Sequence, residues 1–270
     1  MKSLFNLSGK VIVITGGGGL LGVQHALAVH SCGGIPILAD LDEKAANRAA
    51  QQVGGRALPI RLNVTDEESI RGLRSELLKQ FGHIDVLINN AARNPKVEGP
   101  ESERQLGRFE EQDLEAWNED LRVGLTGAML CSRFLGEQMA AQRKGVIVNI
   151  ASDLALIGPD QRLYEREGRA PDRQPKKPAS YSVVKSGLLG LTRYLATYWA
   201  EQGVRVNALC PGGVENGQDP VFLARISRLI PMGRMARQDE YHGALVFLCS
   251  DASEYMTGQA LVVDGGRTVW

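Results

Sequence analysis

The sequence predicts an α/β fold: a doubly wound parallel sheet of seven strands with helices on both faces. Short, nearly continuous apolar runs alternate with longer segments of helical character along the chain. Such runs are typical of parallel strands that helices bury on both faces. The 270 residues contain no internal repeat and no linker, so we expect a single domain over residues 1–270.

Seven apolar runs are predicted as strands, and the segments between the first four of them as helices. The strands are expected at residues 10–14, 35–39, 57–62, 84–88, 146–150, 204–209 and 260–263. The first three helices are expected at residues 19–31, 43–53 and 67–81. Thr65 and Glu68 have the spacing of a capping box, so Thr65 is predicted to cap the third helix.

Composition and charge exclude several classes of function. The formal net charge is +0 at pH 7, which favours neither nucleic acid nor a membrane surface as a partner. The four cysteines and four histidines are scattered and form no CxxC pair, so we expect reduced thiols and no metal site. No apolar stretch has the length of a signal peptide or a membrane-spanning helix, which predicts a cytoplasmic protein.

A glycine-rich segment, TGGGGLLG at residues 15–22, follows the first predicted strand. Glycine lets the backbone turn tightly and approach a pyrophosphate, and the next helix offers unpaired N–H groups. Gly16, Gly19 and Gly22 follow a GxxGxxG spacing and are predicted to line this turn, with Leu21 close to the cofactor. The intervening glycines at 17 and 18 are expected to tolerate side chains, so Gly18→Ser should bind NAD better than Gly22→Val. The motif alone fits a merely flexible turn equally well.

Acidic residues end the second predicted strand, in the order Ala39-Asp40-Leu41-Asp42. A carboxylate here can accept hydrogen bonds from the adenosine ribose of NAD and would repel the 2′-phosphate of NADP. The nearest basic residue is Lys44, so NAD is favoured over NADP. Either acid could instead cap the next helix; Asp42 is the better cap and Asp40 the better ribose ligand.

The segment YSVVK, residues 181–185, places Tyr181 and Lys185 on one face of a predicted helix. An ammonium group near a phenol stabilises the phenolate and lowers its pKa. The pair can therefore move a proton to or from the oxygen of an alcohol or ketone.

With these residues in place, the chain resembles the short-chain dehydrogenases/reductases (SDRs), a Rossmann-type family, over nearly its whole length. The resemblance implies that Tyr181 is the general acid/base, that Lys185 lowers its pKa and binds the nicotinamide ribose, and that Ser152 orients the substrate oxygen. The matching elements are the glycine turn, Asn89-Asn90-Ala91-Ala92, Asn149-Ile150-Ala151-Ser152, the Tyr181/Lys185 pair, Asn207-Ala208-Leu209-Cys210-Pro211-Gly212 and Asp264-Gly265-Gly266.

The same resemblance implies further contacts with a dinucleotide along the ends of the strands. Asn63 and Val64 occupy the adenine position, where the family more often has Asp-Val. Asn89 would lie along the adenosine ribose through its main chain, and Ala91 would also contact the cofactor. The residues implied to wall the nicotinamide are Pro211, Gly212 and Val214.

The sequence departs from the family pattern in two places. Gly124 stands where many members have a catalytic asparagine that helps to hold a water against the lysine, which puts the proton relay in doubt. Ser152 and Tyr181 are 29 positions apart, an unusually long separation for which the segment 158–179 is responsible. This segment is either a substrate lid, with Arg162 and Arg166 meeting hydroxyls, a carboxylate or a phosphate, or a solvated loop of mixed charge. A second long polar segment, residues 93–112, follows the fourth strand.

We therefore expect an NAD-dependent oxidoreductase that interconverts a secondary alcohol and a ketone, acting on a sugar-type or other polyhydroxylated substrate. A non-catalytic dinucleotide sensor or scaffold, or an NAD-using sugar isomerase or epimerase, are the alternatives. The strings GGGGLLG, PDQRLYE and PGGVENG also resemble oxidoreductases of bacterial surface-polysaccharide and nonulosonic-acid biosynthesis. The resemblance further implies a homodimer or homotetramer formed through the helical regions 114–141 and 180–201.

Overall fold

The computed structural model describes residues 4–93 and 108–270 and contains one sheet of seven parallel strands in the order β3-β2-β1-β4-β5-β6-β7. The predicted fold class is therefore confirmed. The strands are β1 (Val11–Thr15), β2 (Ile35–Asp40), β3 (Leu58–Arg61), β4 (Val86–Asn89), β5 (Gly145–Ile150), β6 (Val204–Pro211) and β7 (Ala260–Val263).

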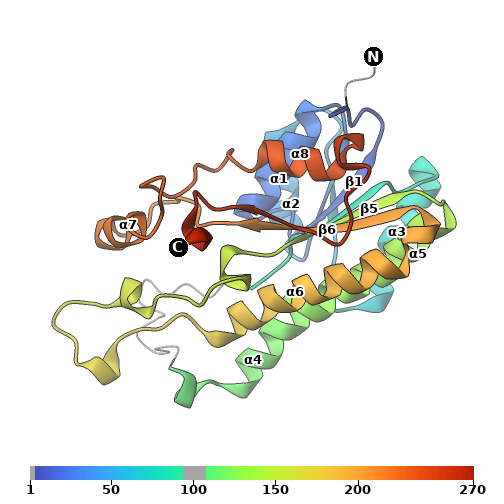
Figure 1. Cartoon of the computed structure of the whole chain (residues 1–270). Coiled ribbons are helices and arrows are strands. Elements are labelled where there is room, and N and C mark those ends of the chain that lie inside the picture. The colour runs from blue at the N-terminus through green and yellow to red at the C-terminus, as the bar shows by residue number, and fades with distance from the viewer. Residues whose placement is uncertain (1–3, 94–107) are drawn as a thin grey trace.

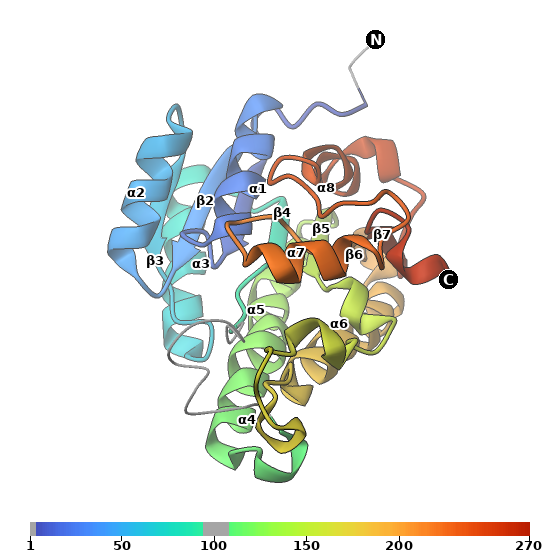
Figure 2. The ribbon, with the colours of Figure 1, turned by 90° about the vertical axis from the view of Figure 1, so that its left-hand side faces the viewer.

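Helices cover both faces of the sheet, as the continuous apolar strands require (Figure 2). One apolar cluster joins the sheet to α1 (Leu20–Ser31), α2 (Glu43–Val53) and α8 (His242–Cys249). The cluster on the opposite face joins it to α3 (Glu67–Phe81), α5 (Gly127–Ala141) and α6 (Ala179–Tyr198). Two further α-helices, α4 (Leu114–Leu121) and α7 (Pro220–Ser227), complete the set in the described residues.

The predicted boundaries agree with the structure to within two residues in each strand, and the second and third helices have the predicted limits. Asp42 caps α2 as expected, since its side chain accepts from the backbone N–H groups of Lys44 and Ala45. The predicted cap of α3 is wrong: Asp66, not Thr65, occupies that position and accepts from Glu68 N. The Thr65 hydroxyl is bound to Asn63 Oδ1 at 2.8 Å instead.

The strand order reverses between β1 and β4, and in open α/β sheets ligands bind beside the carboxyl ends of the strands at this switch point. In Figure 1, α7 and the yellow segment that follows β5 extend beyond one end of the sheet. The glycine turn leaves β1 at the same edge, so segments distant in sequence meet there.

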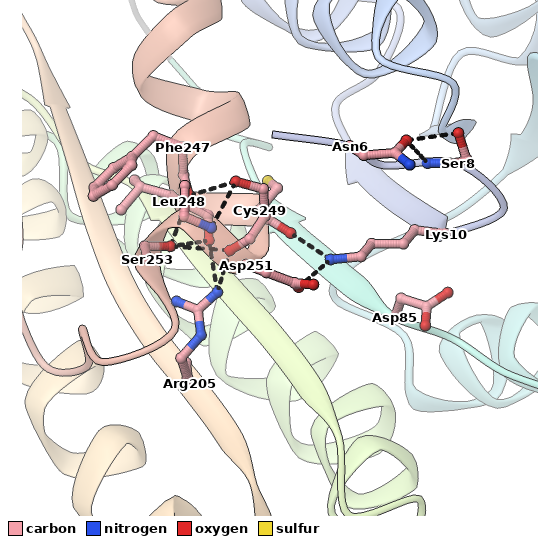
Figure 3. A network of polar contacts seen from close by, with 12 residues as sticks. Asn6, Ser8, Lys10, Asp85, Arg205, Phe247, Leu248, Cys249, Asp251 and Ser253 are labelled. Atoms are coloured by element: carbon pink, nitrogen blue, oxygen red, sulfur yellow. Dashed lines mark hydrogen bonds and ion pairs between the residues drawn. The ribbon is translucent and has the colours of Figure 1, made fainter. Parts of the chain in front are cut away.

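The other end of the sheet is held by two basic side chains (Figure 3). Arg205 on β6 donates to the carbonyl oxygens of Leu248, Ser250 and Met256 at 3.1–3.2 Å. Lys10 donates to Cys249 O at 3.3 Å and pairs with Asp251 at 3.1 Å. These bonds fasten the end of α8 to β1 and β6, far from the glycine turn.

Removal of the Arg205 guanidinium should destabilise the fold. Arg205→Met removes one donor from each of three carbonyl oxygens, which keep other donors, and we expect it to lower the free energy of unfolding by about 1–3 kcal/mol. Arg48→Met, on an exposed part of α2, is the matched control and should change it by less than about 0.5 kcal/mol. Urea unfolding of both variants measures the difference, and equal stabilities would contradict the structural role of Arg205.

Candidate active site

A cavity of about 720 Å³ opens at the carboxyl ends of β1, β2, β4, β5 and β6. Most of the residues that the sequence singles out line it, although they come from positions 16 to 214 of the chain. These residues are Gly16, Gly19, Leu21, Asp40, Asn63, Val64, Ala91, Ser152, Tyr181, Lys185, Pro211, Gly212 and Val214. The four predicted site residues outside the lining are Gly22, Asn89, Arg162 and Arg166.

Close backbone packing explains two of the glycines in the turn. Gly16 has φ +64°, and a Cβ there would lie 2.9 Å from Ala91 Cα at the end of β4. A Cβ on Gly22 would overlap the carbonyl oxygen of Gly16. Both positions therefore require glycine for the turn itself, before any ligand is considered.

The expectation that Gly17 and Gly18 tolerate side chains is wrong. A Cβ on Gly17 would lie 2.7 Å from Leu38 Cα, and one on Gly18 would lie 2.7 Å from Ala45 Cβ. By contrast, a Cβ on Gly19 approaches only Gly16 O, at 3.4 Å. Except at Gly19, glycine is therefore required at each glycine position of the turn, because the turn packs closely between β2, β4 and α2. The spacing of the glycines along the chain does not reveal this constraint.

Asp40 ties the glycine turn to the end of β2. One carboxylate oxygen accepts from Gly18 N at 2.9 Å and the other from Asp42 N at 3.0 Å, and the residue lines the cavity. A carboxylate has further lone pairs, so Asp40 can still accept hydrogen bonds from a ligand. Arg61 on β3 lies in register with Asp40, a basic neighbour that sequence distance concealed, but it is exposed and does not line the cavity.

Thr15 and Asn90 join the ends of β1 and β4 under the turn. The Thr15 hydroxyl accepts from the backbone N–H groups of Asn90 and Ala91, both at 3.0 Å. The Asn90 side chain donates to Thr15 O at 2.9 Å and Gly16 O at 3.1 Å. Neither side chain was predicted to act in the site, yet together they hold the glycine turn against the sheet.

The Asn89 side chain points into the core rather than the cavity. Its amide donates to Ser132 Oγ and to Asn149 Oδ1, both at 2.9 Å, and Asn149 donates in turn to Thr192 Oγ1 at 2.8 Å. All four side chains are buried. This chain of hydrogen bonds links β4 and β5 to α5 and α6, so it fixes the strands and helices that carry the site relative to one another.

Tyr181 and Lys185 enter the cavity from α6, as their spacing predicts. The Lys185 Nζ donates to Ile150 O at 2.7 Å and lies 5.7 Å from the centre of the Tyr181 ring. Burial lowers the pKa of Lys185 to about 8. Burial also raises the pKa of Tyr181, and a hydrogen bond with Ser152 opposes this shift. The direction differs from the expected lowering because desolvation of the phenolate dominates, and the charge of Asp153 raises the pKa further.

Ser152 stands at the end of β5 beside a buried ion pair. Its hydroxyl donates to Asp153 Oδ1 at 2.8 Å, and the other carboxylate oxygen of Asp153 accepts from Arg267 at 2.7 Å. Asp153 and Arg267 are only 2% and 8% exposed. The C-terminal segment thus reaches the part of the cavity that Ser152 and Tyr181 line. No short motif signals this contact, because its partners are more than 100 positions apart.

Gly124 lies in a short π-helical segment, Arg122–Thr126, between α4 and α5. A Cβ at this position would lie 2.6 Å from Val184 Cγ1, on the turn of α6 that carries Lys185. An asparagine could enter only if Val184 moved. The glycine that departs from the family pattern therefore lies where the π-helical segment packs closely against α6.

The segment 158–179 contributes a tyrosine and a lysine, not the predicted arginines, to the lining of the cavity. Arg162 pairs with Asp160 at 2.7 Å and its side chain is 80% exposed. Leu163 is buried against Ile226 of α7, and Tyr164 packs against Phe222 with the ring centres 5.8 Å apart. Tyr164 and Lys177 are the members of the segment that line the cavity. The other long segment of the prediction, 93–112, lies mostly outside the described residues.

Two kinds of feature are absent from the described residues, 4–93 and 108–270. Within these ranges, no helix combines the length and apolar character needed to cross a bilayer. The same ranges contain no group of three or more His, Cys, Asp or Glu side chains arranged to hold a metal ion.

Two family models match the chain in succession. The first, described as short chain dehydrogenase, matches residues 10–164. The second, described as Enoyl-(Acyl carrier protein) reductase, matches residues 170–268. Together they cover nearly the whole sequence, and both describe reductases or dehydrogenases.

Individual relatives are similar over their full length. The chain is 33% identical to the cis-4-hydroxycyclohexanecarboxylate dehydrogenase of Sinomonas cyclohexanicum, covering 96% of each protein. It is 32% identical to the galactitol 2-dehydrogenase (L-tagatose-forming) of Cereibacter sphaeroides, covering 100% of this chain and 99% of the relative. The crystal structure of a gluconate 5-dehydrogenase from Burkholderia cenocepacia J2315, in complex with NADP and tartrate, superposes with a TM-score of 0.83 at 27% identity, covering 99% and 98% of the chains. None of these three names concerns surface polysaccharides, so the narrower resemblance gains no support from them.

The packing of the glycine turn predicts an order of tolerance among its positions. Gly17→Ala and Gly18→Ala place a Cβ against neighbouring backbone or Ala45, and each should cost about 1–3 kcal/mol of stability. Gly19→Ala, where there is room, should cost less than about 1 kcal/mol. Thermal unfolding of the three variants tests this order, which fails if Gly18→Ala proves as stable as Gly19→Ala.

Proposed function

The chain belongs to the short-chain dehydrogenase/reductase family, and on that premise we propose that it oxidises a secondary alcohol to a ketone, or the reverse, with NAD as the hydride carrier and Tyr181 as general acid/base. The observation that carries the proposal is one cavity with two different ends. The glycine turn and Asp40 line one end, and Ser152, Tyr181 and Lys185 line the other.

The cofactor end has the features that a dinucleotide needs. The turn at Gly16 and Gly19 precedes the N-terminus of α1, which provides backbone N–H groups for a pyrophosphate. Asp40 lines the cavity at the end of β2, where it would hold the hydroxyls of the adenosine ribose. Asn63, Val64 and Ala91 lie along the same wall and would contact the adenosine. When bound, the cofactor would supply the hydride chemistry, which no protein side chain provides.

The side chains at the other end handle the proton. As the alcohol becomes a ketone, the Tyr181 phenolate would take the proton from the substrate oxygen and become the phenol; in the opposite direction the phenol would donate that proton to the ketone oxygen. The Lys185 ammonium, fixed by Ile150 O, would stabilise the phenolate that exists before alcohol oxidation and that ketone reduction forms. Ser152 would hold the substrate oxygen, while the Asp153–Arg267 ion pair keeps its hydroxyl in place.

The substrate class follows from the walls of the catalytic end and from the relatives. The relatives' names describe dehydrogenases of a cyclic hydroxy acid and of a polyol. In this chain, Tyr164, Phe222 and Ile226 supply an apolar wall, with polar groups opposite at Ser152 and Tyr181. We infer a compact secondary alcohol with several hydroxyls or a ring.

One observation favours a second candidate, a dinucleotide sensor without catalysis. Gly124 supplies no side-chain amide where the family pattern has asparagine, and Val184 fills the adjacent space. Loss of the proton relay would abolish turnover and leave cofactor binding intact. The presence of Ser152, Tyr181 and Lys185 on one cavity favours the enzyme instead.

Turnover should depend on the Tyr181 hydroxyl. The purified protein is incubated with NAD and a panel of galactitol, D-threitol, D-gluconate and cis-4-hydroxycyclohexanecarboxylate, and NADH absorbance is recorded. Tyr181→Phe should reduce the rate with the best compound by about 10²–10⁴-fold, because the proton then has no acceptor.

Tyr194→Phe is the matched control, since this tyrosine lies on the same helix and its side chain is 63% exposed. It should retain the wild-type rate. A Tyr181→Phe protein as active as wild type would overturn the proposed role of Tyr181. Tight NAD binding without turnover of any compound would favour the sensor.

The preference for NAD should depend on Asp40. Asp40→Ala removes the acceptor for the ribose hydroxyls and the repulsion of a 2′-phosphate, so the ratio of NADP to NAD dissociation constants should fall about tenfold. Asp42→Ala removes only the cap of α2 and should leave that ratio unchanged. Fluorescence titration with NADH and NADPH measures both variants, and an equal loss of the two cofactors in Asp40→Ala would contradict the assignment.

A further inference from the structure

The segment after β7 contributes one charged side chain to the described lining of the cavity, that of Arg267. This residue begins the short 3₁₀ turn Arg267–Val269. Asp264 holds the turn, because its two carboxylate oxygens accept from Gly266 N at 2.9 Å and from Thr268 N at 2.7 Å. Gly266 has φ +89°, which permits the change of direction at this point. The backbone that carries the guanidinium is therefore held on both sides.

Arg267 is connected to Ser152 through one carboxylate. Its Nη1 donates to Asp153 Oδ2 at 2.7 Å, and Asp153 Oδ1 accepts from Ser152 Oγ at 2.8 Å. All three side chains are buried, so water screens their charges and dipoles only weakly. The guanidinium, the carboxylate and the hydroxyl thus form one buried chain of hydrogen bonds, and Ser152 at its end interacts with Tyr181.

The Ser152 hydroxyl has one hydrogen, for which two acceptors compete. A carboxylate can only accept, so the hydrogen between Ser152 and Asp153 comes from Ser152. Leu154 N donates to Ser152 Oγ at 3.2 Å and occupies one of its lone pairs. The Tyr181 phenolate, or a substrate oxygen beside it, can receive the Ser152 hydrogen only when Asp153 gives it up. The strength of the bond to Asp153 therefore affects the reacting groups.

Asp153 also opposes the Tyr181 phenolate through its charge. Two negative charges in a desolvated space repel each other, and the charge of Asp153 raises the pKa of Tyr181 in addition to the effect of burial. Arg267 is in direct contact with this carboxylate. Its positive charge offsets the field of Asp153 at Tyr181 and makes the carboxylate a weaker acceptor for the Ser152 hydrogen.

We propose that Arg267 is a positioning residue for proton transfer, which acts through Asp153 to keep the Ser152 hydrogen and the Tyr181 phenolate available to the reaction. This inference rests on the proposed function and adds a residue of the C-terminal segment to those that support the catalytic step. Without Arg267, the Asp153 carboxylate would hold the Ser152 hydrogen more strongly and repel the phenolate. Neutralisation of Asp153 would have the opposite effect.

Other charged and titratable groups surround Tyr181, and substitutions in the Asp153–Arg267 pair leave their side chains in place. They are Asp40, Tyr164, Lys177 and Lys185 on the described cavity lining, and Arg93, Asp120 on α4 and Cys210 on β6 outside it. Because these groups are common to every variant, differences among the variants report on the Asp153–Arg267 pair.

The test follows the phenol at position 181 and needs no substrate. Tyr181 is replaced by 3,5-difluorotyrosine, whose fluorine atoms withdraw electrons from the ring and let this phenol ionise at lower pH than the other tyrosines. Phenolate absorbance of the full chain is recorded against pH. Arg267→Met should raise the midpoint by about one pH unit, and Asp153→Asn should lower it by about as much, because a nearby negative charge disfavours the phenolate.

The double variant Asp153→Asn/Arg267→Met should return the midpoint close to that of the parent protein, since both charges are then removed. Arg267→Lys should keep the midpoint near the parent value, because an ammonium also neutralises the carboxylate. Arg234→Met is the matched control: it breaks a 2.6 Å ion pair with Glu240 away from the cavity lining and should leave the midpoint unchanged. Thermal unfolding shows whether each variant is folded.

An Arg267→Met midpoint equal to that of the parent would overturn the proposal, because a merely structural arginine changes stability without moving the midpoint. So would an equal rise in the Asp153→Asn background, since the arginine would then not act through Asp153. If Arg267→Met does not fold, Asp153→Asn decides, and a midpoint that fails to fall contradicts the proposal. The expected midpoints in a protein that oxidises no alcohol would leave this role of Arg267 standing while the proposed function fails.

Discussion

The arrangement of the site depends on how α6 crosses the sheet. The Lys185 ammonium donates a hydrogen bond to the carbonyl oxygen of Ile150, the last residue of β5, at 2.7 Å. Further along α6, the Thr192 hydroxyl accepts a hydrogen bond from the Asn149 side chain at 2.8 Å. These two buried bonds set both the distance and the rotation of α6 over β5. Because Ser152 lies two residues after the end of β5, the same contacts determine where it meets Tyr181.

The two ends of the cavity are built by different physical means. At the cofactor end the constraint is steric: the turn lies so close to Ala91, Leu38 and Ala45 that a Cβ fits only at Gly19. At the catalytic end the constraint is electrostatic, since two lysines, a phenol and an ion pair share a desolvated space. Substitutions at the first end should therefore act mainly on folding, and those at the second end on proton transfer and substrate choice.

The long segment between Ser152 and Tyr181 is positioned by its contacts with α7. Leu163 and Tyr164 pack on Ile226 and Phe222, so the segment forms a wall of the cavity although its composition is polar. Its arginines at 162 and 166 do not line the cavity, and the residues that do are a tyrosine and a lysine.

The sequence by itself determined the fold class, the succession of strands and helices along the chain and most of the cavity lining. It could do so because apolar periodicity and short motifs involve only a few neighbouring residues. Tyr181 and Lys185 needed only helical spacing, and Asp42 needed only its place before a helix. Tertiary structure alone decided which glycines tolerate a side chain, that burial raises the pKa of Tyr181, that Arg267 pairs with Asp153, and that Lys177 rather than Arg162 enters the site. Each of these depends on atoms that are distant in sequence and adjacent in space, and on the desolvation that their packing produces.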